Sequence, residues 1–313
     1  MDSHWVTSVL VPSVIVAALL LLLLWPTEHS GRRVLRTWGI AEPTAPQIRE
    51  AVRYLRQRRV LYVALFLLLP PVAGLVWPTG DDDGTPGDIL LPLLAAMLIA
   101  ELVATLRPVS GIRVATLDPR GWRDLVPPWA IAVTAVLAGW AAVLAVLGLS
   151  AQPWADRYLA ALPPDGVPQP PTDWTIDLDP DVRAALAEPS GWFTLGGVAC
   201  CLAVVSALVY LAVRRPSVSD AEVDVALRTR TARVAVAIGF PWLTGLVHDG
   251  QQRIAMLAGH GGDGLPLPRA PGWLTHDFGH LVEIVDLVVL AGALVCWMWL
   301  AVPSRRSLER VPR

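Results

Sequence analysis

The chain of 313 residues contains no lysine, because all 25 of its basic residues are arginines. A retinal Schiff base needs a lysine amine, so light-driven pumps of that kind are excluded. The phosphate-binding P-loop also needs a lysine, so we expect no nucleotide hydrolysis in this chain. A G-x-S-x-G nucleophile elbow and a cluster of cysteine ligands are absent as well. We therefore expect no catalytic chemistry of the chain's own.

Cysteine and charge are both scarce. The three cysteines, Cys200, Cys201 and Cys296, lie inside apolar runs, where thiols act as small packing residues rather than as a disulfide framework. Only 17% of the residues are charged and 54% are apolar, which is typical of a membrane protein. The arginine clusters adjoin apolar runs, so we interpret them as topology determinants that contact anionic lipid, and we expect no nucleic-acid binding.

Seven apolar runs predict membrane-spanning helices. Six of them are long enough, at about 1.5 Å per residue, to cross a hydrocarbon layer of about 30 Å. The sixth run is the shortest and contains Gly239 and Pro241, so we expect a kinked helix that extends at either end. The first run has no positively charged leader and no cleavage site, so we expect it to remain as a span. The runs are Val6–Trp25, Val60–Trp77, Ile89–Leu106, Trp129–Leu149, Trp192–Val213, Val234–Val247 and His280–Val302.

The arginines are sorted between the loops, and this sorting orients the bundle. Of the 25 arginines, 21 fall in the segments 26–59, 107–123, 214–233 and 303–313. With seven spans these four segments lie on one side of the membrane, and basic loops mark the cytoplasmic side. The opposite loops are acidic, as at Asp81–Asp83. We therefore predict an all-α, polytopic protein of the cell membrane with its N-terminus outside and its C-terminus in the cytoplasm.

In this interpretation residues 1–313 form a single integral membrane domain. Its extramembrane parts are a cytoplasmic arginine-rich loop with a helix at 26–59, a long proline-rich extracytoplasmic loop at 150–191, a cytoplasmic helix at 214–233 and a cytoplasmic arginine-rich tail at 303–313. Within the proline-rich loop, Asp179 as N-cap and Pro180 at the first helical position predict a short helix that ends near Ala187.

Two segments on the cytoplasmic side resemble each other. Thr44–Gln47 is a capping box that opens a helix running into the second span, and Ser219–Glu222 is one that opens a helix running into the sixth. Aligned on these boxes, Arg58 meets Arg233. One explanation is a parallel 3+1+3 repeat, with spans one to three duplicated as spans five to seven. The other is two independent helix starts whose arginines lie at headgroup level.

Three acidic residues lie within the apolar runs, namely Glu101, Glu283 and Asp286. A charge at membrane depth is costly, so it usually faces the bundle interior and has a partner or a function. Glu101 lies near the cytoplasmic end of its run, and we expect it to reach the headgroups or to pair with Arg107. For Glu283 and Asp286 we expect pairing with Arg253, or a proton shared between the two acids.

The last run begins with a group of histidines. At about 100° per residue, His276, His280 and Glu283 share one helix face, and this spacing can bind one divalent metal ion. His248 flanks the preceding loop and can add a ligand, and zinc or copper suits such a nitrogen-rich site. The alternative is a polar helix start without a metal, with Thr275 as its N-cap.

Two functions stay open at this point. The first is a multi-pass protein of the cytoplasmic membrane that transports a solute or is an accessory subunit working with other membrane proteins. The second is a metal-binding membrane protein, a sensor or an enzyme, with its site at the outer end of the last helix. A polar cavity that reaches mid-membrane favours transport, whereas convergence of the histidines favours a metal.

Overall fold

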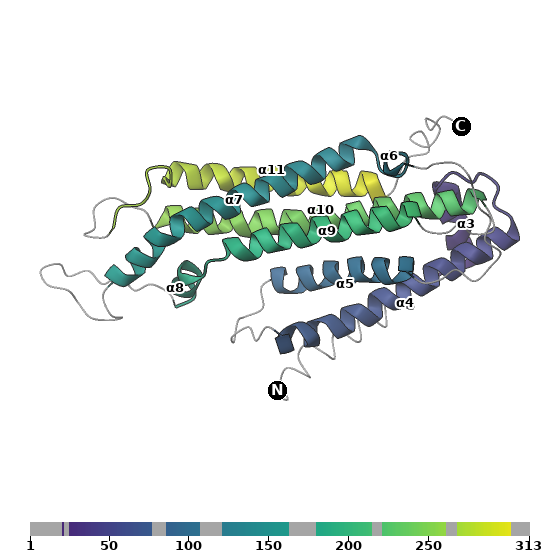
Figure 1. Ribbon diagram of the computed structural model, residues 1–313, viewed down its shortest axis with the longest axis horizontal. Coiled ribbons are helices and arrows are strands. Elements are labelled where there is room, and N and C mark those ends of the chain that lie inside the picture. The colour runs from purple at the N-terminus through teal and green to yellow at the C-terminus, as the bar shows by residue number, and fades with distance from the viewer. Residues whose placement is uncertain are drawn as a thin grey trace, which may run out of the picture. The chain divides into compact units, whose positions relative to one another are not determined.

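The computed structural model describes residues 21, 25–76, 86–106, 121–162, 180–214, 221–260 and 268–301. These residues are 87% helical and contain no strand, which confirms the all-α prediction. The helices are α3 (Glu28–Thr37), α4 (Ala45–Val76), α5 (Pro86–Leu106), α6 (Trp122–Leu125), α7 (Pro128–Ala161), α8 (Pro180–Ala187), α9 (Gly191–Arg214), α10 (Ala221–Gly259) and α11 (His276–Ala301) (Figure 1). Almost all of the first predicted span and the whole tail 303–313 lie outside the described residues.

Three of these helices are long and apolar enough to cross a membrane: Pro128–Ala161, Gly191–Arg214 and His276–Leu300. On α11, Leu287 is 69% exposed and Val288 is 68% exposed. A continuous apolar face of this kind is unfavourable in water and is well solvated by lipid. Length, composition and exposure together support a membrane location.

Several helix boundaries agree with the sequence predictions. α4 begins at Ala45, where the Thr44 amide donates a hydrogen bond to Gln47 Oε1 at 2.8 Å. α8 covers Pro180–Ala187, the short helix predicted in the proline-rich loop. The sixth apolar run extends at both ends into α10, which continues through Pro241. The described residues of each later predicted span lie within one helix.

The end of α7 differs from the prediction. We expected the extracytoplasmic loop to begin at residue 150, but α7 continues through Ala161. The added turns carry apolar residues at helical spacing, and burial of these residues extends the helix past Pro153. In addition, the Trp154 indole donates a hydrogen bond to the carbonyl oxygen of Pro268 at 2.9 Å. The buried residues of this stretch are Ala151, Trp154, Ala155 and Tyr158.

The helices belong to two compact units that divide the long helices between them. Unit 1 comprises Met1–Val133, Leu202–Trp242 and Val295–Arg313. Unit 2 comprises Thr134–Cys201 and Leu243–Leu294. Each unit has its own buried side chains and its own polar clusters, so each is described separately below.

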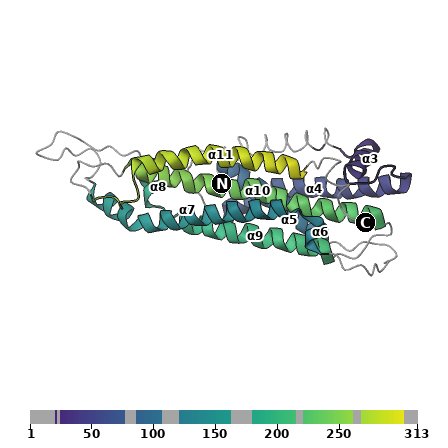
Figure 2. The ribbon, with the colours of Figure 1, turned by 90° about the horizontal axis from the view of Figure 1, so that it is seen from above.

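In unit 1, α4 and α5 pack against each other as an antiparallel hairpin (Figure 1), and α3 lies beside the first turns of α4 (Figure 2). A buried apolar cluster joins α3 to the first turns of both α4 and α10. Further along both helices, Arg58 of α4 reaches Thr231 of α10. The two helix starts therefore run in the same direction. The cluster contains Leu35, Trp38, Ile40, Ile48, Ala51, Val223, Ala226 and Leu227.

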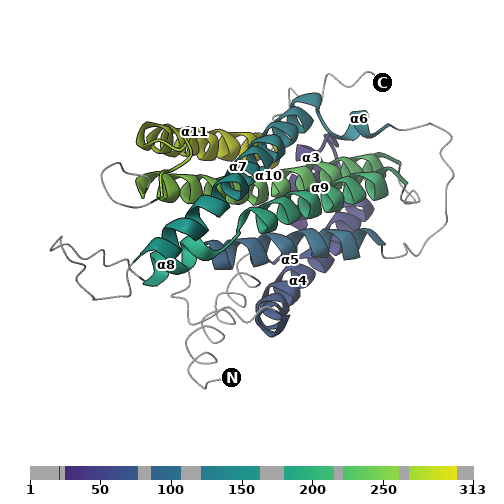
Figure 3. The same ribbon diagram turned by 60° about the vertical axis from the view of Figure 1, so that its left-hand side comes forward.

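In unit 2, α10 is packed closely at glycine positions. A Cβ atom added at Gly250 of α10 would lie 3.0 Å from the Cβ atom of Leu144 in α7. A Cβ atom added at Gly279 of α11 would lie 2.9 Å from the Cβ atom of Ala258 in α10. α10 and α11 run side by side here in all three views (Figure 3). Small residues at such contacts let helix backbones approach, as is typical of membrane helices.

Candidate functional site

A buried ion pair joins Arg58 of α4 to Glu101 of α5 in unit 1. The Arg58 side chain is 2% exposed and the Glu101 side chain is 0% exposed. Tyr62 lies one helical turn after Arg58 and donates its hydroxyl hydrogen to the second oxygen of Glu101. The Glu101 carboxylate therefore has a guanidinium on one oxygen and a phenol on the other.

Thr231 of α10 continues this polar group. Its hydroxyl donates to the Leu227 carbonyl oxygen at 2.8 Å, so its oxygen is free to accept hydrogen bonds. It accepts one from Arg58 Nη2 at 3.0 Å and lies 2.9 Å from the Tyr54 hydroxyl. The result is a chain of polar side chains that links α10, α4 and α5. Its members, which we call the Arg58 cluster, are Tyr54, Arg58, Tyr62, Glu101 and Thr231.

Two guanidinium groups surround the phenol of Tyr54. The Arg58 Cζ atom lies 4.2 Å from the centroid of the Tyr54 ring, and the Arg230 Cζ atom lies 5.5 Å from it. Burial raises the pKa of Tyr54, but the positive charges of Arg58 and Arg230 outweigh it and hold this pKa below its usual value of 10.0. The cluster therefore favours an anionic oxygen at this position.

The prediction for Glu101 is wrong. We expected this acid to reach the headgroups or to pair with Arg107, which lies outside the described residues. Glu101 is instead fully buried and pairs with Arg58. The reason is that α4 and α5 pack against each other, which brings Arg58 beside Glu101. The sequence marked Arg58 as a topology arginine and as the counterpart of Arg233, but not as a partner of Glu101.

Two buried arginines of α10, Arg228 and Arg233, have partners within unit 1. Arg228 pairs with Asp224 at 2.7 Å, one turn earlier in the same helix. Arg233 donates to the Leu125 carbonyl oxygen at 3.2 Å. Arg58 and Arg233 occupy matched positions in the proposed repeat, yet their partners differ. The repeat stays a prediction.

A second polar group lies at the first turns of α11 in unit 2. His280 Nε2 lies 3.0 Å from His276 Nε2, and His280 Nδ1 lies 3.2 Å from Glu283 Oε2. The His280 and Glu283 side chains are 60% and 52% exposed. His248 of α10 hydrogen bonds through Nδ1 to Asp286 Oδ2 at 2.7 Å, and Asp286 is buried. We call these five side chains the α11 histidine cluster.

The α11 histidine cluster brings together three of the four residues proposed as metal ligands. His276, His280 and Glu283 are in contact, whereas His248 is paired with Asp286. Glu283 contacts Nδ1 of the His280 ring, whereas Nε2 of the same ring faces His276. Within the part of the chain that the structure describes, no group of three or more His, Cys, Asp or Glu side chains is arranged to hold a metal ion.

Arg253 does not pair with the acids of α11 as we predicted. It donates to Gln152 Oε1 at 2.8 Å and to the Leu186 carbonyl oxygen at 3.0 Å. These contacts connect α10 to α7 and to the end of α8 within unit 2. A helix end leaves carbonyl groups without intrahelical partners, and Arg253 satisfies one of them. The sequence contained no signal that α8 would end beside Arg253.

The Thr275 prediction agrees with the structure. The Phe278 amide donates a hydrogen bond to Thr275 Oγ1 at 3.2 Å, so Thr275 caps α11.

Comparison of the chain with protein-family models, with curated proteins and with solved structures gives no match. Its function is therefore inferred from the two clusters and from the helices that carry them.

Proposed function

We propose that the chain is a seven-span protein of the cytoplasmic membrane that transports a small solute, with the Arg58 cluster as its cytoplasmic gate. The observation that carries this proposal is the fully buried Arg58–Glu101 pair. Removing two such charges from water costs several kcal/mol, and well-packed apolar side chains are often at least as stable. Ionisable side chains inside bundles of membrane helices characteristically mark the paths of ions and substrates.

Three observations support the proposed topology, with the N-terminus outside and the C-terminus in the cytoplasm. Of the 25 arginines, 21 fall in alternate segments between apolar runs. Three helices have the length and composition of membrane spans. The starts of α4 and α10 are parallel, and with seven spans the second and the sixth cross the membrane in the same direction. These helix starts then lie on the cytoplasmic side.

In this orientation the Arg58 cluster closes the cytoplasmic end of unit 1. When Glu101 is ionised, its attraction to Arg58 holds α4 and α5 together. When Glu101 takes up a proton, that attraction is lost and Arg58 keeps its hydrogen bond to Thr231 of α10. α5 can then separate from α4, which stays bound to α10, and this opens a path lined by the freed polar groups.

The test is solute entry into proteoliposomes that contain the full chain. Sugars, amino acids, organic anions and organic cations are added in turn, and vesicle swelling is followed by light scattering. We expect one solute class to enter faster than into protein-free vesicles. The E101Q variant should change that rate several-fold, whereas E42Q should not, because Glu42 is 89% exposed. If every class enters at the protein-free rate, transport is contradicted and the accessory role takes its place.

The 3.0 Å approach of His276 Nε2 to His280 Nε2 favours a metal-binding protein as a second candidate function. Two zinc ligands at about 2.0–2.1 Å and a tetrahedral angle lie roughly 3.3 Å apart. Glu283 would then orient His280 through Nδ1 rather than bind the metal itself. Zinc or copper analysis of the purified protein tests this proposal. Metal that is lost in H280A and kept in H29A supports it, and native protein without metal contradicts it.

A further inference from the structure

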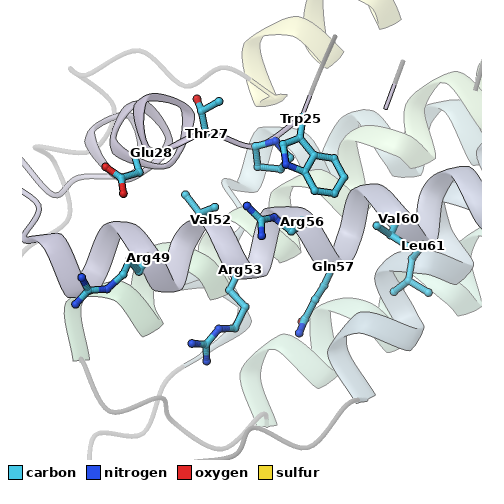
Figure 4. Close-up of a pocket in the computed structure, with 11 residues that line it drawn as sticks. Trp25, Thr27, Glu28, Arg49, Val52, Arg53, Arg56, Gln57, Val60 and Leu61 are labelled. Carbon is cyan, nitrogen blue, oxygen red and sulfur yellow. The ribbon is translucent and has the colours of Figure 1, made fainter. Parts of the chain in front are cut away.

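A cavity of about 740 Å³ lies in unit 1 between α4 and the segment that leads into α3 (Figure 4). We call it the α4 pocket. The arginines Arg49, Arg53 and Arg56 line it together with Trp25 and, further along α4, Val60 and Leu61. Its volume is within the range of pockets that hold small ligands. It is partly open, so a ligand can enter without a rearrangement of the helices.

The residues of α4 that line the pocket change in character along the helix. They recur every three or four positions and so form one helix face. The face begins with Arg49, Arg53 and Arg56 and ends with Val60 and Leu61, as Figure 4 shows from left to right. Val60 is the first residue of the second apolar run. A polar anion at one end and a hydrocarbon chain at the other would match this face.

The arginines of the pocket have no acidic partner in the part of the chain that the structure describes. Among the described residues, no carboxylate lies within ion-pairing distance of Arg49, Arg53 or Arg56. Glu28 also lines the pocket, so the three positive charges face a single negative one. This excess of positive charge favours a bound anion, because guanidinium groups form strong charge-assisted hydrogen bonds to phosphate.

Trp25 closes the pocket above Arg56. The Arg56 Cζ atom lies 5.1 Å from the centroid of the Trp25 ring, at the distance of a cation–π contact. The Trp25 side chain is 42% exposed. An indole beside an arginine and an apolar helix face is the arrangement found at the level of lipid headgroups.

We propose that the α4 pocket binds an anionic phospholipid, with its phosphate between Arg49, Arg53 and Arg56 and its first acyl carbons along Val60 and Leu61. This proposal rests on the membrane location and the orientation given above. A zwitterionic lipid would bring a positive choline group against the same arginines and would bind more weakly. Free phosphate would leave the apolar end of the pocket empty.

The test uses the full-length protein in detergent with dioctanoyl phosphatidylglycerol as the probe. Thermal unfolding and native mass spectrometry measure its binding, with dioctanoyl phosphatidylcholine and inorganic phosphate as comparisons. We expect saturable stabilisation by phosphatidylglycerol alone. The R53Q/R56Q variant should weaken its binding by about tenfold or more. The control R32Q/R33Q removes the same charge from α3, outside the pocket, and should leave binding unchanged.

Three results would overturn the proposal. Equal stabilisation by phosphatidylcholine would exclude recognition of charge, and equal stabilisation by phosphate would make this a free-anion site. An equal loss in R53Q/R56Q and R32Q/R33Q would show non-specific attraction. The W25L variant gives a charge-neutral second test and should also weaken binding. Lipid retention is measured without any solute, so a failure of the transport proposal leaves its outcome unaffected.

Discussion

The buried charges of Glu101 and Arg58 compensate each other in the folded chain. Both side chains are almost completely buried, so removal of one leaves an uncompensated charge in an apolar environment. Thr231 accepts a hydrogen bond from Arg58 and Tyr62 donates one to Glu101, but neither carries an opposite charge. The coupling between the two charges should therefore be large and measurable.

The first prediction concerns that coupling. The E101L variant should lower the free energy of unfolding by about 3–5 kcal/mol, because Arg58 stays buried without its partner. The double variant R58M/E101L should lose less than E101L alone. Unfolding in mixed detergent micelles, arranged as a double-mutant cycle, measures this difference. The exposed-site control E42Q should change stability by less than about 0.5 kcal/mol. Additive losses in the double variant would mean that the two charges do not interact.

The second prediction concerns the pKa of Tyr54. This pKa lies below 10.0 in the folded chain, so the folded state releases the phenolic proton at a lower pH than the unfolded state. The group therefore adds stability as the pH rises through the folded pKa towards 10, and adds none at neutral pH. Absorbance at 295 nm follows phenolate formation. The Y54F variant should lose an early part of this titration; an unchanged curve would contradict the proposed influence of Arg58 and Arg230.

At the scale of helices, unit 2 is held together by close helix contacts at Gly250 and Gly279, where α10 meets α7 and α11. The third prediction compares two glycines of α11. A Cβ atom at Gly279 would meet the Ala258 Cβ atom at 2.9 Å, whereas a Cβ atom at Gly292 has open space around it. G279A should therefore lower stability by about 1–3 kcal/mol, and G292A should change it by less than about 1 kcal/mol. Thermal unfolding of both variants decides the point, and equal effects would show that α10 and α11 do not pack at Gly279.

Helix starts were the features most open to prediction from the sequence. The caps at Thr44 and Thr275 depend on neighbouring residues, and both agree with the structure. The extension of α7 was missed because its helical spacing of apolar residues follows an internal proline. α3 was not predicted. Thr27 and Ser30 cap its first turn, but the capping box that a sequence usually reveals has Glu or Gln in the place of Ser30.

The partners of buried charges could not be predicted in the same way. Arg58 and Glu101 are distant in sequence, and they meet only because α4 and α5 form a hairpin. The sequence suggested Glu283 and Asp286 as partners of Arg253. In the structure Arg253 instead contacts Gln152 and the end of α8. Such pairings depend on the packing of helices, and no local pattern encodes that packing.

At the scale of the whole molecule, charge and hydrophobicity are separated along the chain. Arginines gather in alternate segments between apolar runs, and the apolar helices expose broad apolar faces. Lipid solvates apolar faces of this kind, and basic segments mark the cytoplasmic side of a membrane, which gives the orientation proposed above. The proposed gate at Arg58 and the proposed lipid site at Arg53 and Arg56 both require this orientation.

Cysteine labelling of right-side-out membrane vesicles tests this orientation most directly. Single cysteines replace Arg36, Glu188 or Arg214 in a chain whose three native cysteines are serines. A membrane-impermeant maleimide should label E188C in sealed vesicles, and R36C and R214C only after permeabilisation. Glu188 lies three residues before α9 and Arg214 is its last residue, so the two results together show that α9 crosses the membrane. Labelling of both E188C and R214C in sealed vesicles, or labelling of R36C before permeabilisation, would contradict the proposed topology.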